Sequence, residues 1–294
     1  MLRPLASSLA PRLDLSTTPT SGPSIRWLGT AGIAIEHEGH TLLIDPYVSR
    51  RSIADCVRAP LRPDFGAIAR IVPNADAIVL GHTHIDHALD APTIAKATGA
   101  LVLGSRSAAT LCRREGVPAS QVVDVESRLG VGGYATEVGP FKLRFFASAH
   151  SKLILGRVPF AGEIDDCDAV PIRTEGYKCG AVFCAEITVG GRRFVHLGSA
   201  DLVEAALPRD VQGADLMFLT VAGWTKTPRF PERMLRAFDP SRILLSHWDD
   251  FFAPVDLPPR ALPAMGMDRL VDAITQESAR AQLGWVPMLA RHWT

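Results

Sequence analysis

The stretch GHTHIDHALD, residues 81 to 90, places three histidines and an aspartate within six positions, in a chain that has only nine histidines. In an extended segment, side chains two residues apart point the same way, so His82 and His84 can present their rings to one point. Asp86 and His87 follow where the chain begins to curl, and they aim at a neighbouring point. The spacing therefore predicts a site for one metal ion, with a second ion close to it.

The residue types in this cluster favour particular metals. Imidazole nitrogens and carboxylate oxygens suit zinc, manganese or iron, and no cysteine lies close enough in the sequence to suggest a thiolate site. The alternative is a polar loop whose histidines only form hydrogen bonds. Because the H-x-H-x-D-H arrangement is far more specific than a lone histidine, the pattern favours metal binding.

Apolar segments of β-strand length occupy both halves of the chain. The run DAIVLG, residues 76–81, leads directly into the cluster and places it at the C-terminal end of a buried strand. Apolar runs bounded by turn-forming residues predict strands in the ranges 24–29, 32–39, 41–46, 76–81, 100–104, 141–150, 215–221 and 242–250, with a hairpin over 180–201. Early prolines, closing glycines and apolar spacing predict helices over 91–98, 107–115, 231–238 and 268–281.

These elements predict an α/β fold with two sheets packed face to face and flanked by helices. A single domain is expected over residues 24–294, after a Ser/Thr/Pro-rich flexible leader over residues 1–23. Residues 151–178 carry glycine and proline without clear periodicity. This segment is too long for a plain connection, and we interpret it as either a lid or a structured insert.

The overall composition narrows the class of partner. Lysine plus arginine equals aspartate plus glutamate at 31 each, which argues against nucleic acid and anionic membranes and favours a small-molecule substrate. No apolar run approaches the roughly 18 to 20 residues that cross a bilayer, so no membrane span is expected. Five cysteines without C-x-x-C spacing fit reduced thiols in the cytoplasm. An exposed sheet edge would allow a homo-oligomer, although nothing in the sequence requires one.

Two further histidines stand where predicted strands end. His150 closes FASAH and His247 lies in LLSHWDD, and each begins a polar turn. Strand ends converge at one rim of a layered fold, where functional residues commonly gather. Either histidine alone would more often be a surface or capping residue, but with the first cluster present we expect both to join the metal site.

From residue 24 to about residue 255, the order of these motifs resembles that of metallo-β-lactamase-fold hydrolases. SIRWLGTAGIAIEHEGHTLLIDP leads to GHTHIDH, then to His150, to a loop near residue 200, and to SHW. The resemblance implies a four-layer αβ/βα sandwich of two mixed sheets with a dinuclear metal site. It implies one ion bound by His82, His84 and His150, and the other by Asp86, His87 and His247. The order and compactness are most similar to the ascorbate-6-phosphate lactonase-like branch.

The sequence departs from the family at one position. The family usually has a carboxylate that bridges both metals in a Gly-Asp-Thr-like turn, whereas this chain reads FVHLGSADL, with Ser199 directly after Gly198. Asp201 points the same way as Ser199 in an extended chain, which makes it the candidate bridge. The alternative for Asp201 is a helix N-cap, with Glu204 completing a capping box.

Two buried-type residues outside the cluster also have interpretations. The resemblance suggests that Asp45 holds a ligand imidazole in one tautomer, and the alternative is an Asx turn before Pro46. His196 alternates with Phe194 along a strand, and we interpret it as a buried, hydrogen-bonded histidine rather than a substrate contact.

The predicted site supports a hydrolytic function. Two divalent ions, expected to be zinc with manganese or iron as alternatives, would supply a metal-bound hydroxide that attacks an ester-like bond. We expect Asp86 to orient the water and accept its proton. The substrate would be a lactone, a phosphodiester or a related small molecule. Two alternatives remain open, a di-iron redox enzyme with the same ligands and a non-enzymatic metal-binding protein.

Overall fold

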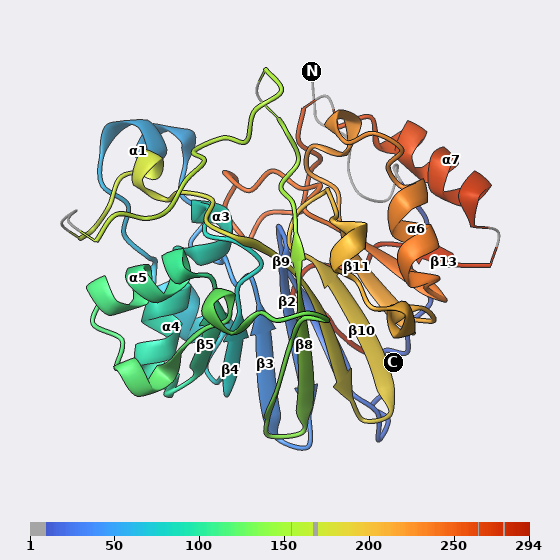
Figure 1. Ribbon diagram of the computed structural model, residues 1–294, viewed down its shortest axis with the longest axis horizontal. Helices are drawn as coiled ribbons and strands as arrows, with labels where there is room; N and C mark the ends of the chain where they lie inside the picture. Colours follow the sequence, from blue (N-terminus) through green and yellow to red (C-terminus); the bar gives the residue numbers. More distant parts are fainter. Residues whose placement is uncertain (1–9, 154, 167–169, 264, 279) are drawn as a thin grey trace.

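The computed structural model describes residues 10–153, 155–166, 170–263, 265–278 and 280–294, and its two seven-stranded sheets lie face to face (Figure 1). The first sheet has the strand order β14 (Arg291–Trp293), β1 (Ser24–Gly29), β2 (Gly32–His37), β3 (His40–Ile44), β4 (Ala77–Val79), β5 (Leu101–Gly104) and β6 (Val122–Asp124). The second has the order β13 (Gln282–Gly284), β12 (Arg242–Ser246), β11 (Leu216–Thr220), β10 (Arg192–Leu197), β9 (Val182–Val189), β8 (Phe141–Ser148) and β7 (Tyr134–Val138).

Both sheets are mixed. Strands β3 to β6 pair in parallel, as do strands β10 to β13, and the remaining pairs are antiparallel. Parallel neighbours need crossover connections, which places helices on the outer faces. The helices within the crossover connections are α1 (Ile53–Arg58), α2 (Phe65–Ile71), α3 (Ile85–Ala88), α4 (Ala91–Thr98), α5 (Arg106–Arg114), α6 (Glu232–Phe238) and α7 (Met267–Glu277). The expected four-layer α/β sandwich is confirmed.

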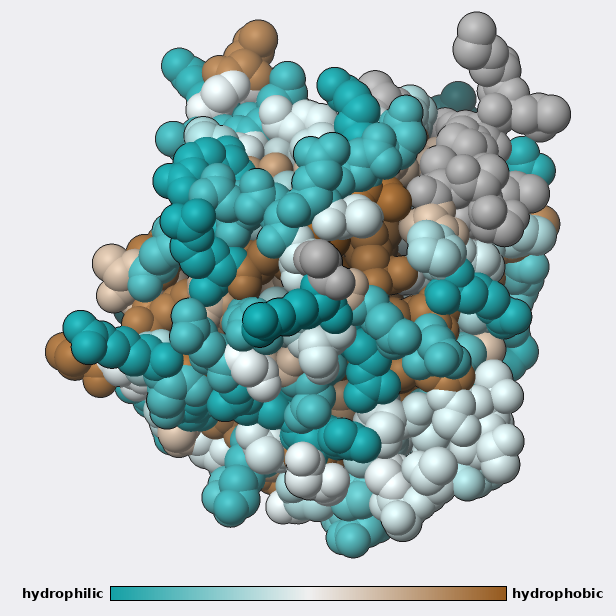
Figure 2. Space-filling model, turned by 90° about the vertical axis from the view of Figure 1, so that its right-hand side faces the viewer, coloured by the Kyte–Doolittle hydropathy of each residue, from teal (hydrophilic) through white to brown (hydrophobic). Residues whose placement is uncertain are grey.

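The alternation of side chains along each strand divides the apolar core in two. In β2, Ile33 and Ile35 face the second sheet, whereas Ala34 faces the helices that cover the first sheet. Helices α4 and α5 lie outside the first sheet, and α6 and α7 lie outside the second (Figure 1). Viewed from the side of α6 and α7, the surface is mostly hydrophilic with apolar residues in the hollows between (Figure 2).

Most predicted elements form where the sequence pattern places them. Helix α4 has the predicted bounds, and the hairpin of β9 and β10 turns at Gly190 and Gly191 as expected. The pattern misses the short edge strands β6, β7, β13 and β14 and the helices α1, α2 and α3. These elements have three to seven residues, which is too short for a periodic apolar signal.

The described part of the predicted leader is not separate from the domain. Leu13 and Leu15 are buried in the core, and the amide of Leu13 donates to the carbonyl oxygen of Trp285 at 2.9 Å. Ser16 forms a bridge with Trp293. The expected boundary at residue 23 therefore does not separate residues 10–23 from the domain, because their backbone pairs with residues near the C-terminus. Residues 1–9 of the predicted leader lie outside the described residues.

The described part of the segment 151–178, called the insert below, is joined to the body of the domain. It contains one short 3-10 helix, Thr174–Gly176, and Ile164, Ile172 and Tyr177 are buried in the helix-side core. The amide of Leu61 donates to the carbonyl oxygen of Ile172 at 2.9 Å, which joins the insert to the body of the domain.

Within the described part of the chain, no helix is both long and apolar enough to cross a membrane.

Candidate metal centre

The histidine cluster lies where β4 ends and α3 begins. His84 has extended dihedrals (φ −63°, ψ 158°) and precedes the first helical turn, which contains Asp86 and His87. This change from extended to helical backbone sends His82 and His84 to one place and the next two side chains to another, as predicted. Glycine at position 81 allows the two sheets to approach closely just before the cluster. A Cβ atom there would stand 2.6 Å from the Cα atom of Gly198, which directly follows β10 of the second sheet.

The first group of potential ligands consists of His82, His84 and His150, which offer nitrogens within 4.8 Å of one another. Nδ1 of His82 lies 2.9 Å from the carbonyl oxygen of Gly198, and Nε2 of His84 lies 2.8 Å from that of Pro159. Nδ1 of His150 lies 2.7 Å from the carbonyl oxygen of Ser151. A carbonyl only accepts, so each outer nitrogen carries the proton and the inner nitrogen keeps its lone pair.

The second group consists of Asp86, His87 and His247. Nε2 of His247 lies 3.0 Å from Oδ2 of Asp86 and 3.3 Å from Nε2 of His87, and that nitrogen of His87 lies 3.8 Å from Oδ2 of Asp86. A tetrahedral ion with ligands at 2.0 to 2.2 Å would separate neighbouring ligands by about 3.3 Å. The three atoms therefore already have nearly the spacing that such an ion requires.

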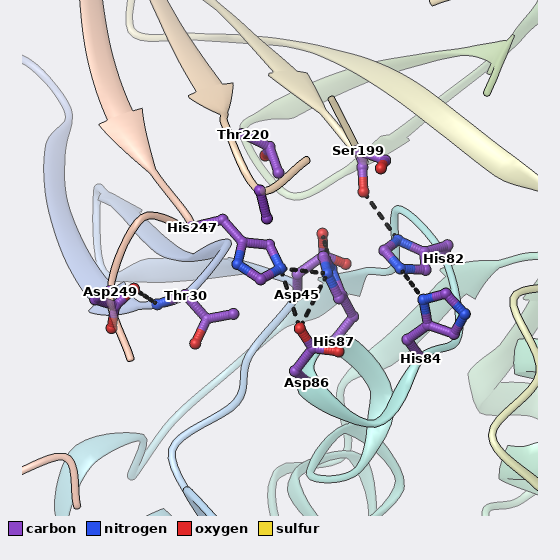
Figure 3. Close-up of polar contacts among 12 residues, drawn as sticks. Thr30, Asp45, His82, His84, Asp86, His87, Ser199, Thr220, His247 and Asp249 are labelled. Atoms are coloured by element: carbon purple, nitrogen blue, oxygen red, sulfur yellow. Dashed lines mark hydrogen bonds and ion pairs between the residues drawn. The ribbon is translucent and has the colours of Figure 1, made fainter. Parts of the chain in front are cut away.

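The two groups adjoin each other at one end of the sheets (Figure 3). The ring centroids of His82 and His87, which belong to different groups, are 3.8 Å apart. Six of the seven predicted metal ligands are thus brought together in two sets of three.

The protonation pattern tests whether a cation fits. Nε2 of His82 and Nδ1 of His84 face each other at 2.9 Å, although each neutral ring has used its one proton on a backbone carbonyl. Two bare lone pairs at this distance repel, and a positive ion between them removes the repulsion. The donor set of neutral imidazoles with one carboxylate suits a divalent metal such as zinc. The residues present therefore fit the metal that the sequence predicts.

Asp45 occupies the position expected of a carboxylate that orients a ligand. Its Oδ2 lies 2.9 Å from Nδ1 of His87 and 2.9 Å from Nε2 of His196, and Oδ1 accepts from the amide of Gly81 at 2.7 Å. The carboxylate fixes the proton of His87 on Nδ1 and leaves Nε2 to face the second group. His196 is fully buried and hydrogen-bonded, which confirms its interpretation from the strand alternation.

Burial and neighbouring charges set the protonation of the site. Burial would raise the pKa of Asp45, but His87 and His196 outweigh it and lower the pKa to about 2. Burial would likewise raise the pKa of Asp86, and His87 and His247 lower it instead. Burial, together with His84, lowers the pKa of His150 to about 4. At neutral pH, the site thus presents ionised carboxylates and a neutral His150.

His247 is held by a network that sequence reasoning misses. It has a left-handed backbone conformation (φ 59°), and its amide donates to the carbonyl oxygen of Thr30 at 2.7 Å. Asp249 accepts from the amide of Thr30 at 2.9 Å and from Nη2 of Arg50 at 2.8 Å. Left-handed conformations at non-glycine residues cost free energy and occur where the surroundings impose them. No local sequence pattern indicates this network, because Arg50 and Asp249 are 199 positions apart.

The structure does not bring Asp201 to the site. Its Oδ1 lies 2.9 Å from Nη1 of Arg233 and accepts from the amide of Leu202 at 2.8 Å. No helix begins at Asp201 either, since the next helical turn begins at Glu204 with Val203 as its N-cap. The position at which the resemblance implies a bridging carboxylate is instead occupied by Ser199, which is buried beside the first group (Figure 3). Asp201 is therefore corrected from a candidate bridge to a partner of Arg233.

A cavity of about 780 Å³ opens above both groups of ligands. All six clustered residues contribute to its floor, and its walls come from α1, from the insert and from the loop after β12. Phe251 and Phe252, which directly follow the DD sequence, line it as well. A volume of this size accommodates a small organic molecule.

Comparison with known proteins assigns the family. The sequence profile of a family described as the beta-lactamase superfamily domain matches residues 40–248, which is well over half of the chain. The chain therefore belongs to the beta-lactamase superfamily. A UPF0173 metal-dependent hydrolase from Anaeromyxobacter sp. (strain K) is 27% identical over 239 residues, which cover 80% of this chain and 77% of that protein.

Two solved structures share the fold at low sequence identity. The metallo-beta-lactamase fold protein YhfI from Bacillus subtilis has a TM-score of 0.53 at 14% identity, covering 92% of this chain and 98% of that chain. CmlA, a diiron beta-hydroxylase from Streptomyces venezuelae, has a TM-score of 0.55 at 15% identity, covering 94% of this chain and 54% of that chain. With its family and relatives, the chain is a metal-dependent hydrolase, whereas the narrower lactonase-like placement stays a prediction.

Proposed function

We propose that this hydrolase binds two divalent ions, expected to be zinc with manganese or iron as alternatives, and cleaves an ester-like bond of a small molecule. The observation that carries the proposal is the pair of adjacent three-ligand groups at the floor of one cavity. Metal ions held there would lower the pKa of a water molecule toward about 7 and polarise the bond to be cleaved.

The residues of the site have separate roles in binding the metals and in orienting water. His82, His84 and His150 present neutral nitrogens because backbone carbonyls hold their protons on the far side of each ring. Asp45 likewise holds the proton of His87 on Nδ1 and leaves Nε2 unprotonated. Asp86 stays ionised at neutral pH because His87 and His247 lower its pKa, so a carboxylate oxygen is available to orient water and accept its proton.

The walls of the cavity protect the reaction from bulk solvent. The insert and the loop after β12 both line the cavity above the ligand groups, and both contribute apolar side chains. Exclusion of water strengthens every electrostatic contact at the floor.

Four described cysteines are free, which supports the proposal of a reducing compartment such as the cytoplasm.

Metal content and turnover test this function together. We expect elemental mass spectrometry to find near two ions per chain in the wild type and in Asp201→Ala, because Asp201 pairs with Arg233 outside both groups. The double variant His82→Ala, His84→Ala should lose at least one ion and nearly all hydrolysis of activated esters. Full ester hydrolysis by that double variant would exclude the proposal. Bound iron with visible absorption, and no hydrolysis, would favour a redox enzyme instead.

A further inference from the structure

The walls of the cavity differ sharply in chemistry from its floor. The floor carries the six imidazole and carboxylate side chains, whereas the walls carry large apolar side chains. Ile53 and Val57 come from α1, Leu153 and Phe160 come from the insert, and Phe251 follows the second ligand group. A substrate whose reacting bond lies at the floor therefore extends along an apolar wall.

Helix α1 presents its apolar residues to the cavity rather than to the core. It has no buried residue, and Ile53 and Val57 are 57% and 69% exposed. Residues four apart share one helix face, and both of these line the cavity. Exposed apolar side chains gathered at the mouth of a site are typical of a surface that a ligand covers.

Polar contacts hold both ends of α1, and Cys56 between them packs against the helix-side core. Ser52 and Asp55 form a capping box at its start. The hydroxyl of Thr174 donates to the carbonyl oxygen of Cys56 at 2.7 Å, and Nη2 of Arg173 donates to that of Val57 at 3.0 Å. The insert thus holds the backbone of α1 and leaves the helix's apolar face available to a substrate.

The described wall also lacks the charge that a phosphate would need. Arg173 is the one lysine or arginine among the described residues that line the cavity. Its Nε lies 3.1 Å from Oε1 of Glu175, and its Nη2 donates to the carbonyl oxygen of Val57. Phosphate groups are usually held by arginine or lysine donors aimed at their oxygens. The one cation of the wall is engaged by the protein itself.

We propose that the substrate is an uncharged carboxylic ester or lactone with an aliphatic hydrocarbon tail. In the bound substrate, this tail lies against Ile53, Val57 and Phe160. The proposal rests on the hydrolytic function above and narrows its substrate class. The ester carbonyl lies over the two ligand groups. Water adds to its carbon and the acyl C–O bond breaks, which gives an acid and an alcohol from an ester and a single hydroxy acid from a lactone. A phosphodiester fits this cavity less well, because no described side chain of the wall is free to pair with its charge.

Substrate series with one leaving group test the proposal on the zinc-loaded protein. We expect kcat/KM for para-nitrophenyl octanoate to exceed that for the acetate by at least tenfold, since each fully buried methylene contributes roughly fourfold. Bis(para-nitrophenyl) phosphate should be hydrolysed at least a hundredfold less efficiently than the octanoate. A flat dependence on chain length, or a preference for the phosphodiester, would overturn the substrate class while leaving hydrolysis intact.

Substitutions of two exposed valines test whether α1 causes the preference for long acyl chains. Val57→Ser should lower the octanoate-to-acetate ratio of kcat/KM at least fivefold. Val131→Ser, which changes a fully exposed valine that does not line the cavity, should leave this ratio unchanged. An equal effect of both substitutions on this ratio would contradict the proposal that the substrate's aliphatic chain lies against α1.

Binding of an unreactive mimic separates this proposal from the proposed function. Long and short trifluoromethyl ketones resemble the ester but cannot be hydrolysed, and their affinities can be measured by calorimetry. Tighter binding of the long ketone without turnover of any ester would support the apolar site and overturn the hydrolytic function. Equal binding of the two ketones without ester turnover would overturn both.

Discussion

Nε2 of His82 and Nδ1 of His84 lie 2.9 Å apart, and each ring holds its proton on the opposite nitrogen, against a backbone carbonyl. The fold thus directs two lone pairs at each other inside a buried site. Burial lowers the pKa of both histidines, so protonation at neutral pH does not relieve the repulsion. The site is arranged for a metal before any metal arrives.

Metal removal should therefore destabilise the protein. With free zinc at about 100 times its Kd, binding contributes roughly 2.7 kcal/mol to the free energy of unfolding, and a chelator should remove this contribution. The double variant His82→Ala, His84→Ala should show a much smaller chelator effect in denaturant titrations. The matched variant His37→Ala, His40→Ala, with both changes outside the site, should respond like the wild type. Equal chelator effects in all three proteins would contradict metal binding at the cluster.

Asp45→Asn should weaken binding at the second ligand group. The substitution removes the negative charge that holds the proton of His87 on Nδ1. Loss of such an orienting partner typically lowers metal affinity by about 10- to 100-fold. Competition with a chromogenic zinc chelator measures the change. Asp76→Asn is the control, because Asp76 also accepts from a histidine and a backbone amide but lies outside the site. A similar affinity loss in both variants would point to a general structural defect.

Ser199→Asp should supply the carboxylate that the sequence resemblance implies between the two metals. Ser199 is buried and lines the cavity beside His82. A carboxylate there adds a negative charge and an oxygen ligand, so zinc affinity should rise at least tenfold. Ser199→Ala removes the hydroxyl without adding a charge and should bind zinc like the wild type. Unchanged affinity in Ser199→Asp would show that this position does not reach the ions.

The buried pair of Arg50 and Asp249 should contribute strongly to stability. Both side chains are at most 3% exposed, and Asp249 also accepts from the amide of Thr30. Asp249→Ala leaves an unpaired buried guanidinium and should cost about 3 to 5 kcal/mol in the free energy of unfolding. Asp256→Ala is the matched control, because Asp256 pairs with Arg70 at the surface and should cost under about 1 kcal/mol. Similar costs in urea titrations would refute the structural role.

Asp90 should make stability depend on pH in an unusual direction. Burial raises its pKa to about 6, although hydrogen bonds from Ser49 and Val48 oppose the rise. The folded pKa lies above the ordinary value of 3.8, so the folded state binds more protons, and the stabilising contribution is lost as the pH rises toward 6 and above.

The test for Asp90 compares metal-free wild type with Asp90→Asn. The difference in their free energies of unfolding should shift against the wild type by about 1 kcal/mol between pH 5 and pH 7. A constant difference between wild type and Asp90→Asn would show that Asp90 titrates normally.

Much of the fold and of the site was predictable from local patterns. The apolar runs of β1 to β5 and β8 to β12 predict strands, because short buried runs bounded by turn residues are typical of sheets that are covered on both faces. The H-x-H-x-D-H spacing predicts two neighbouring groups of ligands, because an extended segment followed by a helical turn directs side chains to two points. His150 and His247 were predicted because both follow predicted strands, and functional residues commonly gather where strand ends converge.

Only the tertiary structure decided which distant residues complete the site. Asp45 and His196 are 151 positions apart, and Arg50 and Asp249 are 199 positions apart, so no local pattern could pair them. Asp201 shows the same limit, because its sequence position suited a bridge while Arg233, from α6, holds its carboxylate elsewhere. Local sequence determines backbone conformation and side-chain direction. Pairing between charges depends on how the two sheets and their helices pack, which only the folded chain establishes.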